Sequence, residues 1–195
     1  MFEKFKIRIV QNMINNGIIE KEDAEVYQFA IDALKTYLGI LVMTLSIGFL
    51  MHTFVESFVF LISFKLLRAE AGGYHASSEI KCFFVSVIML IFSFALIRET
   101  AEVVPFWLFM AFLVTSVFIV CCNAPLPDKN NPMNEKERLY HRRRARFIVI
   151  TESVISLFLY RCSRKIAFTI LMAMVVVSTS LVVWLIIHRV DNIKK

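Results

Sequence analysis

A cysteine and a histidine lie seven residues apart in a short polar stretch of an otherwise apolar chain. The stretch runs Arg68-Ala-Glu-Ala-Gly-Gly-Tyr-His75, and Cys82 follows it. A thiol and an imidazole in hydrogen-bond contact are the minimum equipment of a cysteine nucleophile and its base. A buried cysteine can equally serve as a small apolar residue, and a loop histidine can be solvated or can cap a helix. The residue types alone leave both interpretations open.

The spacing decides which local structure this chemistry requires. Seven residues of regular α-helix would hold His75 and Cys82 about 10 Å apart along the axis, too far for a hydrogen bond of about 3 Å. The two glycines before His75 offer a remedy, because glycine adopts turn conformations that other residues avoid. Ser77 or Ser78 can then N-cap a following helix. Cys82 would lie in the first turns of that helix, where a thiolate is stabilised.

The rest of the chain has the composition of membrane-packed helices. Of the 195 residues, 58% are hydrophobic, and the mean hydropathy is +0.67, which excludes an ordinary soluble domain. The sequence predicts an all-α polytopic membrane protein with about six transmembrane helices, some of them short or re-entrant. The hydrophobic runs cover residues 31–51, 54–67, 83–97, 103–122, 147–160 and 166–187. The second and fifth runs are the short ones, and they carry Glu56 and Glu152.

One membrane domain, residues 1–195, is the predicted organisation. Its parts are an amphipathic surface segment at 1–25, two spans at 31–67, the polar stretch and helix start at 68–82, two spans at 83–122, a basic loop at 123–146 and two spans at 147–187. The first segment mixes Lys4, Lys6 and Arg8 with phenylalanine and isoleucine, which is typical of an interfacial helix. A solvated cap packed on the bundle is the alternative.

The basic residues indicate an orientation in the cell membrane. With the N-terminus in the cytoplasm, eighteen of the 22 basic residues face the cytoplasm, as the positive-inside rule requires. The exceptions are Arg98, Arg161, Arg164 and Lys165. The multi-pass chain therefore presents its polar stretch to the cytoplasm. In that compartment its four cysteines are expected to be reduced rather than to form a disulfide framework.

Metal and nucleic-acid sites find little support in the sequence. Neither a His-Glu-x-x-His nor a Cys-x-x-Cys pattern occurs, so no metal and no cofactor is expected. A zinc site that combines Cys82 and His75 with His141, or with the Cys121–Cys122 pair, is a weak rival. Nucleic-acid binding does not suit so hydrophobic a chain, whose sequence shows no pattern of interleaved aromatic and basic residues. The densest basic cluster is typical of a topogenic signal that also contacts anionic lipids; it comprises Arg142, Arg143, Arg144 and Arg146.

The pattern R-x-x-x-G-G-x-H-x-x-x-x-x-x-C, formed by Arg68, Gly72, Gly73, His75 and Cys82, resembles the accessory gene regulator B (AgrB) family. Members of this family are membrane cysteine endopeptidases of Gram-positive quorum sensing. The resemblance extends over essentially the whole chain. It includes the chain length, the N-terminal amphipathic segment, the six hydrophobic runs and the asparagine- and proline-containing segment at 122–132 before the basic cluster.

The resemblance implies a specific reaction. Cys82 would be the nucleophile and His75 its base, in an enzyme that cuts an AgrD-like precursor near its C-terminus. The acyl thioester on the enzyme would then be attacked by an internal cysteine or serine of the peptide, which closes a thiolactone or lactone ring. Arg68, Glu70 and the two glycines take supporting or positioning roles. No third catalytic residue is assigned. Glu70 and Glu79 are near in sequence, and Glu56 or Glu152 could approach through the fold.

The resemblance also implies partners. These are the AgrD-like precursor, membrane lipids and a second copy of the chain in a homodimer, and the basic cluster would dock the acidic tail of the precursor. A non-enzymatic peptide transporter or scaffold is the rival function. A transporter would place polar groups at mid-bilayer on discontinuous helices. Here they gather in loops, apart from Glu56 and Glu152, which favours the enzyme.

Overall fold

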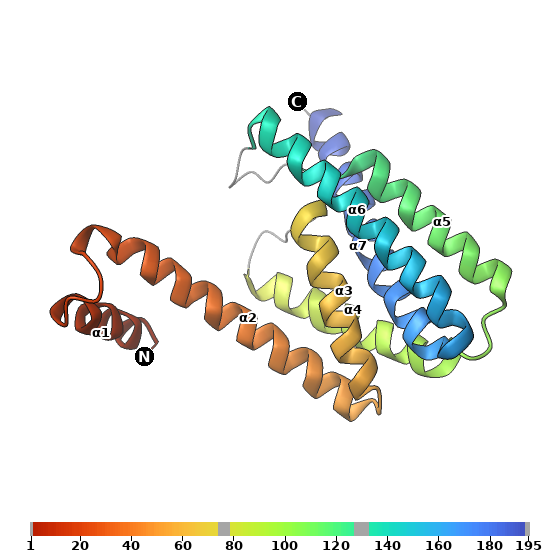
Figure 1. The fold of residues 1–195 in the computed structure, drawn as a ribbon, viewed down its shortest axis with the longest axis horizontal. Helices are drawn as coiled ribbons and strands as arrows, with labels where there is room; N and C mark the ends of the chain where they lie inside the picture. The colour runs from red at the N-terminus through yellow and green to blue at the C-terminus, as the bar shows by residue number, and fades with distance from the viewer. Residues whose placement is uncertain (1, 74–78, 127–132, 194–195) are drawn as a thin grey trace. The chain divides into compact units, whose positions relative to one another are not determined.

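The chain is almost entirely helical (Figure 1). A computed structural model describes residues 2–73, 79–126 and 133–193, and these residues contain no strand. The helices are α1 (Phe2–Asn15), the 3-10 helix η1 (Lys21–Asp23), α2 (Ala24–Leu50), α3 (Phe54–Ala71), α4 (Glu79–Thr100), α5 (Phe106–Asn123), α6 (Glu135–Cys162) and α7 (Arg164–Ile193). The all-α prediction is confirmed. The contacts divide the chain into two compact units, residues 1–43 and residues 44–195.

The first unit pairs α1 with the beginning of α2. The ammonium of Lys6 lies 2.7 Å from a carboxylate oxygen of Asp32, and the Lys6 side chain is almost fully buried. The neighbouring side chains of Phe5 and Ile7 on the same helix are more than half exposed. An amphipathic helix that leaves apolar side chains uncovered by its own unit is suited to lie on a bilayer surface.

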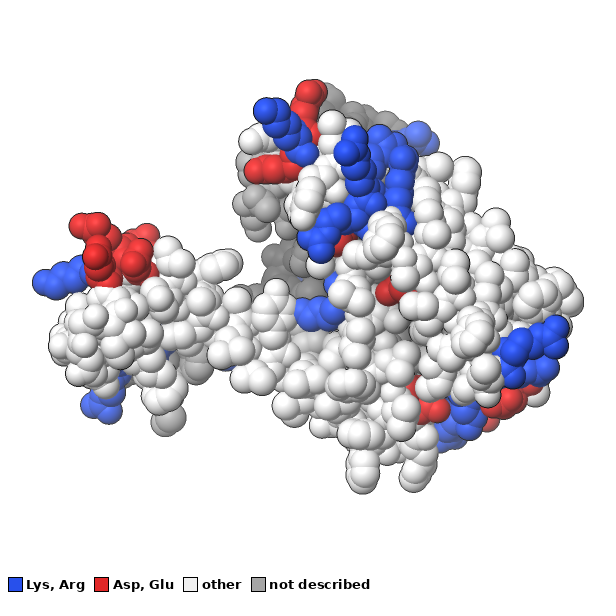
Figure 2. Space-filling model, in the orientation of Figure 1, with Lys and Arg blue, Asp and Glu red and all other residues white. Residues whose placement is uncertain are grey.

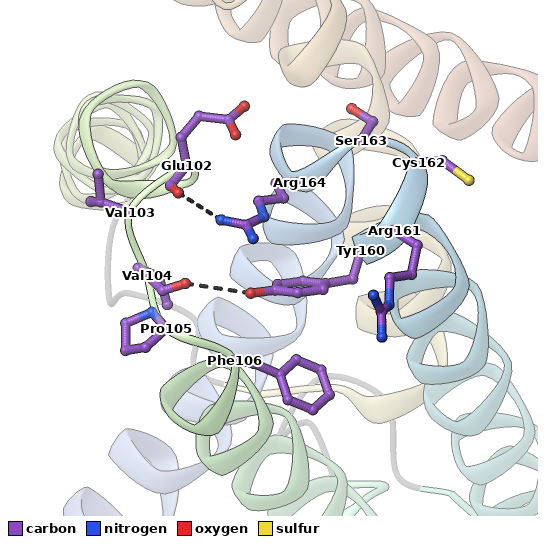
Figure 3. A pocket seen from close by; sticks show the side chains of 10 residues that line it. All are labelled: Glu102, Val103, Val104, Pro105, Phe106, Tyr160, Arg161, Cys162, Ser163 and Arg164. Carbon is purple, nitrogen blue, oxygen red and sulfur yellow. Dashed lines mark hydrogen bonds between the residues drawn. The ribbon is translucent and has the colours of Figure 1, made fainter.

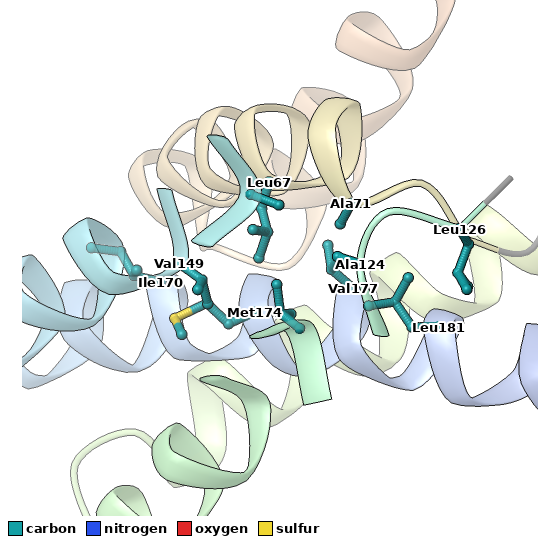
Figure 4. Close-up of a cluster of buried hydrophobic side chains, with 11 residues drawn as sticks. Leu67, Ala71, Ala124, Leu126, Val149, Ile170, Met174, Val177 and Leu181 are labelled. Atoms are coloured by element: carbon teal, nitrogen blue, oxygen red, sulfur yellow. The ribbon is translucent and has the colours of Figure 1, made fainter. Parts of the chain in front are cut away.

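The second unit is built around α7. Residues 167–174 of this helix are buried without interruption, and α7 packs against α3, α4, α5 and α6. Apolar side chains of α3, α5, α6 and α7 meet in one cluster, together with the segment that follows α5 (Figure 4). The cluster comprises Leu67, Ala71, Val120, Ala124, Leu126, Ala145, Val149, Ile170, Met174, Val177 and Leu181. This core fixes the C-terminal end of α3, where the polar stretch begins.

Four helical segments in the described part of the chain are long and apolar enough to cross a membrane. They are Lys21–Leu50, Lys81–Thr100, Phe106–Asn123 and Arg164–Ile187. Helices α3 and α6 cover the two short runs but carry too many charged residues to meet the same criterion, so the count of six spans is not confirmed. In the second unit, charged side chains gather mainly at the two ends, with a largely uncharged band between them (Figure 2).

The basic segment before the fifth run differs from the prediction. It was expected to be a loop through residue 146, yet α6 begins at Glu135 and runs without a break to Cys162. The backbone N–H of Asn134 donates to the Glu137 carboxylate at 3.0 Å, which helps fix the first turn. Glutamate and arginine are good helix formers, and this is the physical reason for the difference. The arginine cluster is therefore held on a rigid helix.

Candidate functional site

The polar stretch begins with a glycine turn at the end of α3. Gly72 has φ of 69° and Gly73 has φ of 133°, values that residues with a side chain rarely adopt. The N–H of Gly72 still donates to the carbonyl oxygen of Arg68 at 3.1 Å, so the helix closes normally before the chain turns away. The predicted turn at the two glycines is present.

Space as well as conformation excludes side chains here. A Cβ on Gly72 would lie 2.8 Å from the carbonyl oxygen of Leu126, which is backbone and cannot move aside easily. A Cβ on Gly73 would collide with Nη1 of Arg68 and lie 2.6 Å from Oγ of Ser180. At Gly72 both the backbone conformation and the neighbouring backbone require glycine, whereas at Gly73 the conformation favours glycine and a Cβ would displace the side chains of Arg68 and Ser180.

Arg68 holds the turn from the helix side. Its Nη1 donates to the carbonyl oxygen of Gly72 and to the hydroxyl of Ser180 on α7, both at 2.7 Å. A guanidinium presents several donors in one rigid plane, so a single side chain can bind two acceptors at once. The arginine therefore ties the end of α3 to α7, which is a positioning contact.

The segment after α5 supports the same turn from another direction. The N–H of Leu126 donates to the carbonyl oxygen of Ala71 at 3.1 Å, and Ala124, Pro125 and Leu126 are all buried. The Ala124–Pro125 peptide bond is cis. Residues 124–126 belong to the asparagine- and proline-containing stretch at 122–132. The backbone of Leu126 lies directly against Ala71 and Gly72 and so bounds the glycine turn on one side. Residues 127–132 lie outside the described part of the chain.

The carboxylate of Glu70 is paired with two basic side chains of α6. The Glu70 side chain is 9% exposed, and its carboxylate oxygens lie 2.7 Å from Nδ1 of His141 and 3.2 Å from Nη1 of Arg144. A nearly buried carboxylate needs such partners, because an unpaired buried charge is strongly unfavourable. These contacts pin α6 to the end of α3 and occupy the side chain that was a candidate third catalytic residue.

The four arginines of the cluster fall into two pairs. Arg144 also contacts Tyr140, donating to its hydroxyl at 3.1 Å and lying 5.4 Å from its ring centroid. Arg146 donates to the carbonyl oxygen of Cys121 at 3.2 Å from Nε and 3.0 Å from Nη2. In the described part of the chain, Nε of Arg142 is buried without a hydrogen-bond partner. Arg143 is exposed. Within the described residues, Arg142 and Arg143 are thus the two arginines of the cluster without a hydrogen bond or ion pair, Arg143 exposed and Arg142 partly buried.

Cys82 is carried by the first turn of α4, three residues after the helix begins at Glu79. It is partly buried and its thiol is free. His75, Ser77 and Ser78 lie outside the described residues, so the contact between His75 and Cys82 and the capping serine stay predictions. What the described residues fix is the two ends of the intervening segment, the turn at Gly73 and the start of α4.

Other carboxylates lie away from this turn. Glu152, in the middle of α6, is 6% exposed, and neither of its carboxylate oxygens has a hydrogen-bond partner among the described residues. Glu56 lies partly buried in the first turn of α3, at the opposite end of that helix from Gly72. Within the described residues no three histidine, cysteine or acidic side chains come together as a metal site.

Three contacts that build the turn were missed by the sequence reasoning. They are the hydroxyl of Ser180, the backbone of Leu126 and the imidazole of His141. Each lies far along the chain from the residue it contacts. The sequence marks only the 122–132 segment, through its asparagines and prolines just before the basic cluster. That pattern does not predict the contact between Leu126 and Ala71.

Comparison with known proteins covers most of the chain. The family model for accessory gene regulator B matches residues 7–187. A putative AgrB-like protein of Lactiplantibacillus plantarum is 25% identical over 182 residues, which are 92% of this chain and 88% of that protein. Putative AgrB-like protein 2 of Clostridium perfringens is 25% identical, over 82% of this chain and 79% of that protein. Accessory gene regulator protein B of Staphylococcus lugdunensis is 28% identical, over 60% and 61%. No solved structure matches.

Proposed function

Because this membrane protein belongs to the accessory gene regulator B family, and so to the agr quorum-sensing system, we propose that it is a cysteine endopeptidase that matures a signalling peptide. Its substrate is an AgrD-like precursor, cut near the C-terminus. Cys82 is the nucleophile and His75 its base. The observation that carries the proposal is the anchored turn at Gly72 and Gly73, which fixes the chain two residues before His75.

The reaction is two successive acyl transfers. His75 accepts the thiol proton of Cys82, and the thiolate sulfur attacks the carbonyl carbon of the scissile peptide bond. The carbon–nitrogen bond then breaks, and the leaving amine takes the proton from the imidazolium. The N-terminal part of the precursor is now a thioester on Cys82, and the C-terminal fragment departs.

Ring closure completes the sequence. The thiol of a cysteine within the held peptide attacks the thioester carbonyl, a new carbon–sulfur bond forms, and Cys82 leaves and recovers its proton. A serine in that place gives a lactone. Exchange of one thioester for another is nearly isoenergetic, so the site must chiefly exclude water and hold the peptide folded back. A turn built from fixed contacts suits that task better than a free loop.

The supporting residues follow from their contacts. Arg68, with the two glycines, positions the segment that carries His75. Glu70 positions α6 rather than acting on a proton, because its carboxylate is engaged by His141 and Arg144. Arg142 and Arg143 receive the acidic tail of the precursor or anionic headgroups. The site faces the cytoplasm, as does the N-terminus, and a homodimer is the expected assembly; the charge bias along the chain supports this orientation.

Reconstitution with the precursor tests the assignment. Cys82→Ala and His75→Ala should each abolish release of the C-terminal fragment from proteoliposomes. Cys121→Ala, Cys122→Ala and Cys162→Ala are matched controls, since each removes a free thiol elsewhere and should leave cleavage intact. Release by the Cys82→Ala variant at the rate of these controls would exclude the proposed nucleophile.

One observation favours the rival function, peptide transport. Glu152 is a buried carboxylate on α6, the helix that covers the fifth apolar run, and buried carboxylates within the membrane commonly line an ion or substrate path. Glu152→Gln separates the two functions. If transport alone is the activity, this variant should stop peptide uptake into vesicles while Cys82→Ala does not. If the chain is the endopeptidase, Cys82→Ala stops product formation regardless of Glu152.

A further inference from the structure

A pocket of about 810 Å³ opens at the end of the second unit that lies opposite the glycine turn (Figure 3). It lies between the connection from α4 to α5 and the tight turn from α6 to α7. Its lining includes Val104, Phe106, Tyr160, Arg161, Cys162 and Arg164. None of these residues takes part in the proposed chemistry of Cys82, so the pocket is a separate feature of the molecule.

Two guanidinium groups give the pocket its charge. Arg164 donates from Nη1 to the backbone oxygen of Glu102 at 3.0 Å and lies 5.4 Å from the centroid of the Tyr160 ring. Arg161 is exposed, on the other side of that ring in Figure 3, and has no ion pair within the described residues. Glu102 contacts Arg164 through its backbone oxygen, and its carboxylate, which belongs to the same pocket lining, forms no ion pair with either arginine among the described residues.

Two helices begin at the pocket and two end beside it. Helix α5 begins at Phe106 and α7 at Arg164, while α4 ends at Thr100 and α6 at Cys162, so the positive and negative ends of the helix dipoles offset one another here. The first N–H groups of a helix have no acceptor within it. Together with two arginines, which match the geometry of phosphate oxygens, such donors favour a phosphate group over a cation or a neutral ligand.

The surface beside the pocket indicates that a ligand with a phosphate group would also have an apolar part. Val103 is 74% exposed, Phe106 53% and Trp107 70%, so a strongly apolar surface adjoins the pocket. A soluble phosphate would leave that surface uncovered, whereas a ligand with an anionic head and an apolar tail covers both parts. Tyrosine and tryptophan at such a level are typical of the membrane–water interface.

We propose that this pocket binds the phosphate headgroup of an anionic phospholipid, with Arg161 and Arg164 as its ligands and the acyl chains along Phe106 and Trp107. The proposal also accounts for an anomaly in the charge distribution. In the proposed orientation, Arg161 and Arg164 lie on the side of the membrane where basic residues are otherwise scarce, and a bound anionic lipid would account for their position. It does not depend on the role of Cys82.

Lipid titration of the full-length protein tests the site. The protein, purified in a neutral detergent, is titrated with phosphatidylglycerol or phosphatidylcholine of identical acyl chains, and bound lipid is counted by native mass spectrometry. Phosphatidylglycerol should bind about tenfold or more tightly than phosphatidylcholine, since both carry the anionic phosphodiester but the choline group adds a positive charge beside the two arginines. Arg161→Gln/Arg164→Gln should remove this preference. The matched control, Arg98→Gln/Lys165→Gln, removes two charges near the same end and should retain it.

Cys162 supplies a second readout on a chain with both arginines intact. It lines the pocket and is exposed, so in a variant with Cys82, Cys121 and Cys122 replaced by alanine it is the single thiol for a maleimide. Phosphatidylglycerol should slow its labelling severalfold, and phosphatidylcholine should not. Soluble glycerophosphoglycerol, which has the phosphate but no acyl chain, should protect poorly at the same concentration.

The proposal has clear contrary outcomes. Equal affinity of the wild-type protein for the two lipids would overturn it, as would a preference that survives in Arg161→Gln/Arg164→Gln. Equal protection of Cys162 by glycerophosphoglycerol would assign the pocket to a soluble phosphate compound instead of a lipid.

Discussion

The guanidinium of Arg68 occupies the space that a side chain on Gly73 would need. The same group donates to the carbonyl oxygen of Gly72 and to Ser180, so arginine and glycine form two halves of one contact. Arg68 lies about one helical turn before Gly72, which lets its side chain reach forward over the end of α3. The four-residue spacing between Arg68 and Gly72 in the sequence is therefore explained by one turn of helix at the end of α3.

Gly73→Ala should lower the free energy of unfolding by about 1–3 kcal/mol, because alanine must adopt an unfavourable φ and also displace Arg68. Precursor cleavage should fall with it, since His75 follows two residues later. Thermal unfolding in detergent and cleavage in proteoliposomes measure the two effects. Gly39→Ala is the control, because a Cβ at Gly39 meets nothing within 4 Å. If the two variants behave alike, the turn is not tightly fixed.

Glu70→Gln should reduce stability while keeping most of the catalytic rate. The substitution weakens the contacts with His141 and Arg144 that join α3 to α6. The expected result is a lower unfolding temperature, a kcat within a few-fold of wild type and an unchanged shape of the pH–rate profile. A fall in kcat of about a thousandfold at unchanged stability would instead make Glu70 a member of the catalytic machinery.

Much of this arrangement follows from local sequence. The apolar runs predict the helices, the paired glycines predict the break after Ala71, and the helix that begins at Glu79 carries Cys82 in its first turn. Local rules cover these features because helix propensity and glycine turns involve residues close in sequence.

The long-range contacts could not be predicted in this way. Ser180 is 112 residues from Arg68, and His141 is 71 residues from Glu70. Neither has a periodicity or motif that marks its partner, because the partner is selected by how α6 and α7 pack on α3. The same packing separates Arg144 and Arg146, which make internal contacts, from their sequence neighbours Arg142 and Arg143.

The arginine cluster should therefore contain one pair that binds the precursor and another pair that stabilises the fold. Arg142→Gln/Arg143→Gln should weaken precursor binding, with a smaller salt dependence than wild type, at nearly unchanged stability. Arg144→Gln/Arg146→Gln removes the same charge but breaks the contacts with Glu70 and the Cys121 carbonyl, so it should lower the unfolding temperature. Binding titrations at two salt concentrations and thermal unfolding distinguish the pairs. Identical effects from both pairs would contradict the division.

Attachment of α1 to α2 should be insensitive to pH in the physiological range. Hydrogen bonds to Asp32 and then Glu3 raise the pKa of Lys6 above its ordinary value of 10.5. The stabilising contribution of this lysine is thus fully present below about pH 10.5 and is lost only as the pH rises through the raised pKa. Limited proteolysis between α1 and α2 should proceed equally at about pH 6 and about pH 9.

Asp32→Asn should accelerate that proteolysis at both pH values, because it removes the principal partner of Lys6. Glu25→Gln, a neutralisation at an exposed position in the first turn of α2, is the control and should leave the rate unchanged. A wild-type rate that rises severalfold between the two pH values would refute the ion pair as the attachment.

The most direct test of the central proposal is to trap the acyl-enzyme. A precursor whose ring-forming cysteine is replaced by alanine cannot close the ring, so its N-terminal part should remain on the enzyme. Intact-protein mass spectrometry should then detect one adduct of that mass, sensitive to hydroxylamine and mapped to Cys82. The adduct should be absent from Cys82→Ala and present in Cys121→Ala, Cys122→Ala and Cys162→Ala. Cleavage of this precursor without an adduct, or with an adduct on another cysteine, would contradict Cys82 as the nucleophile.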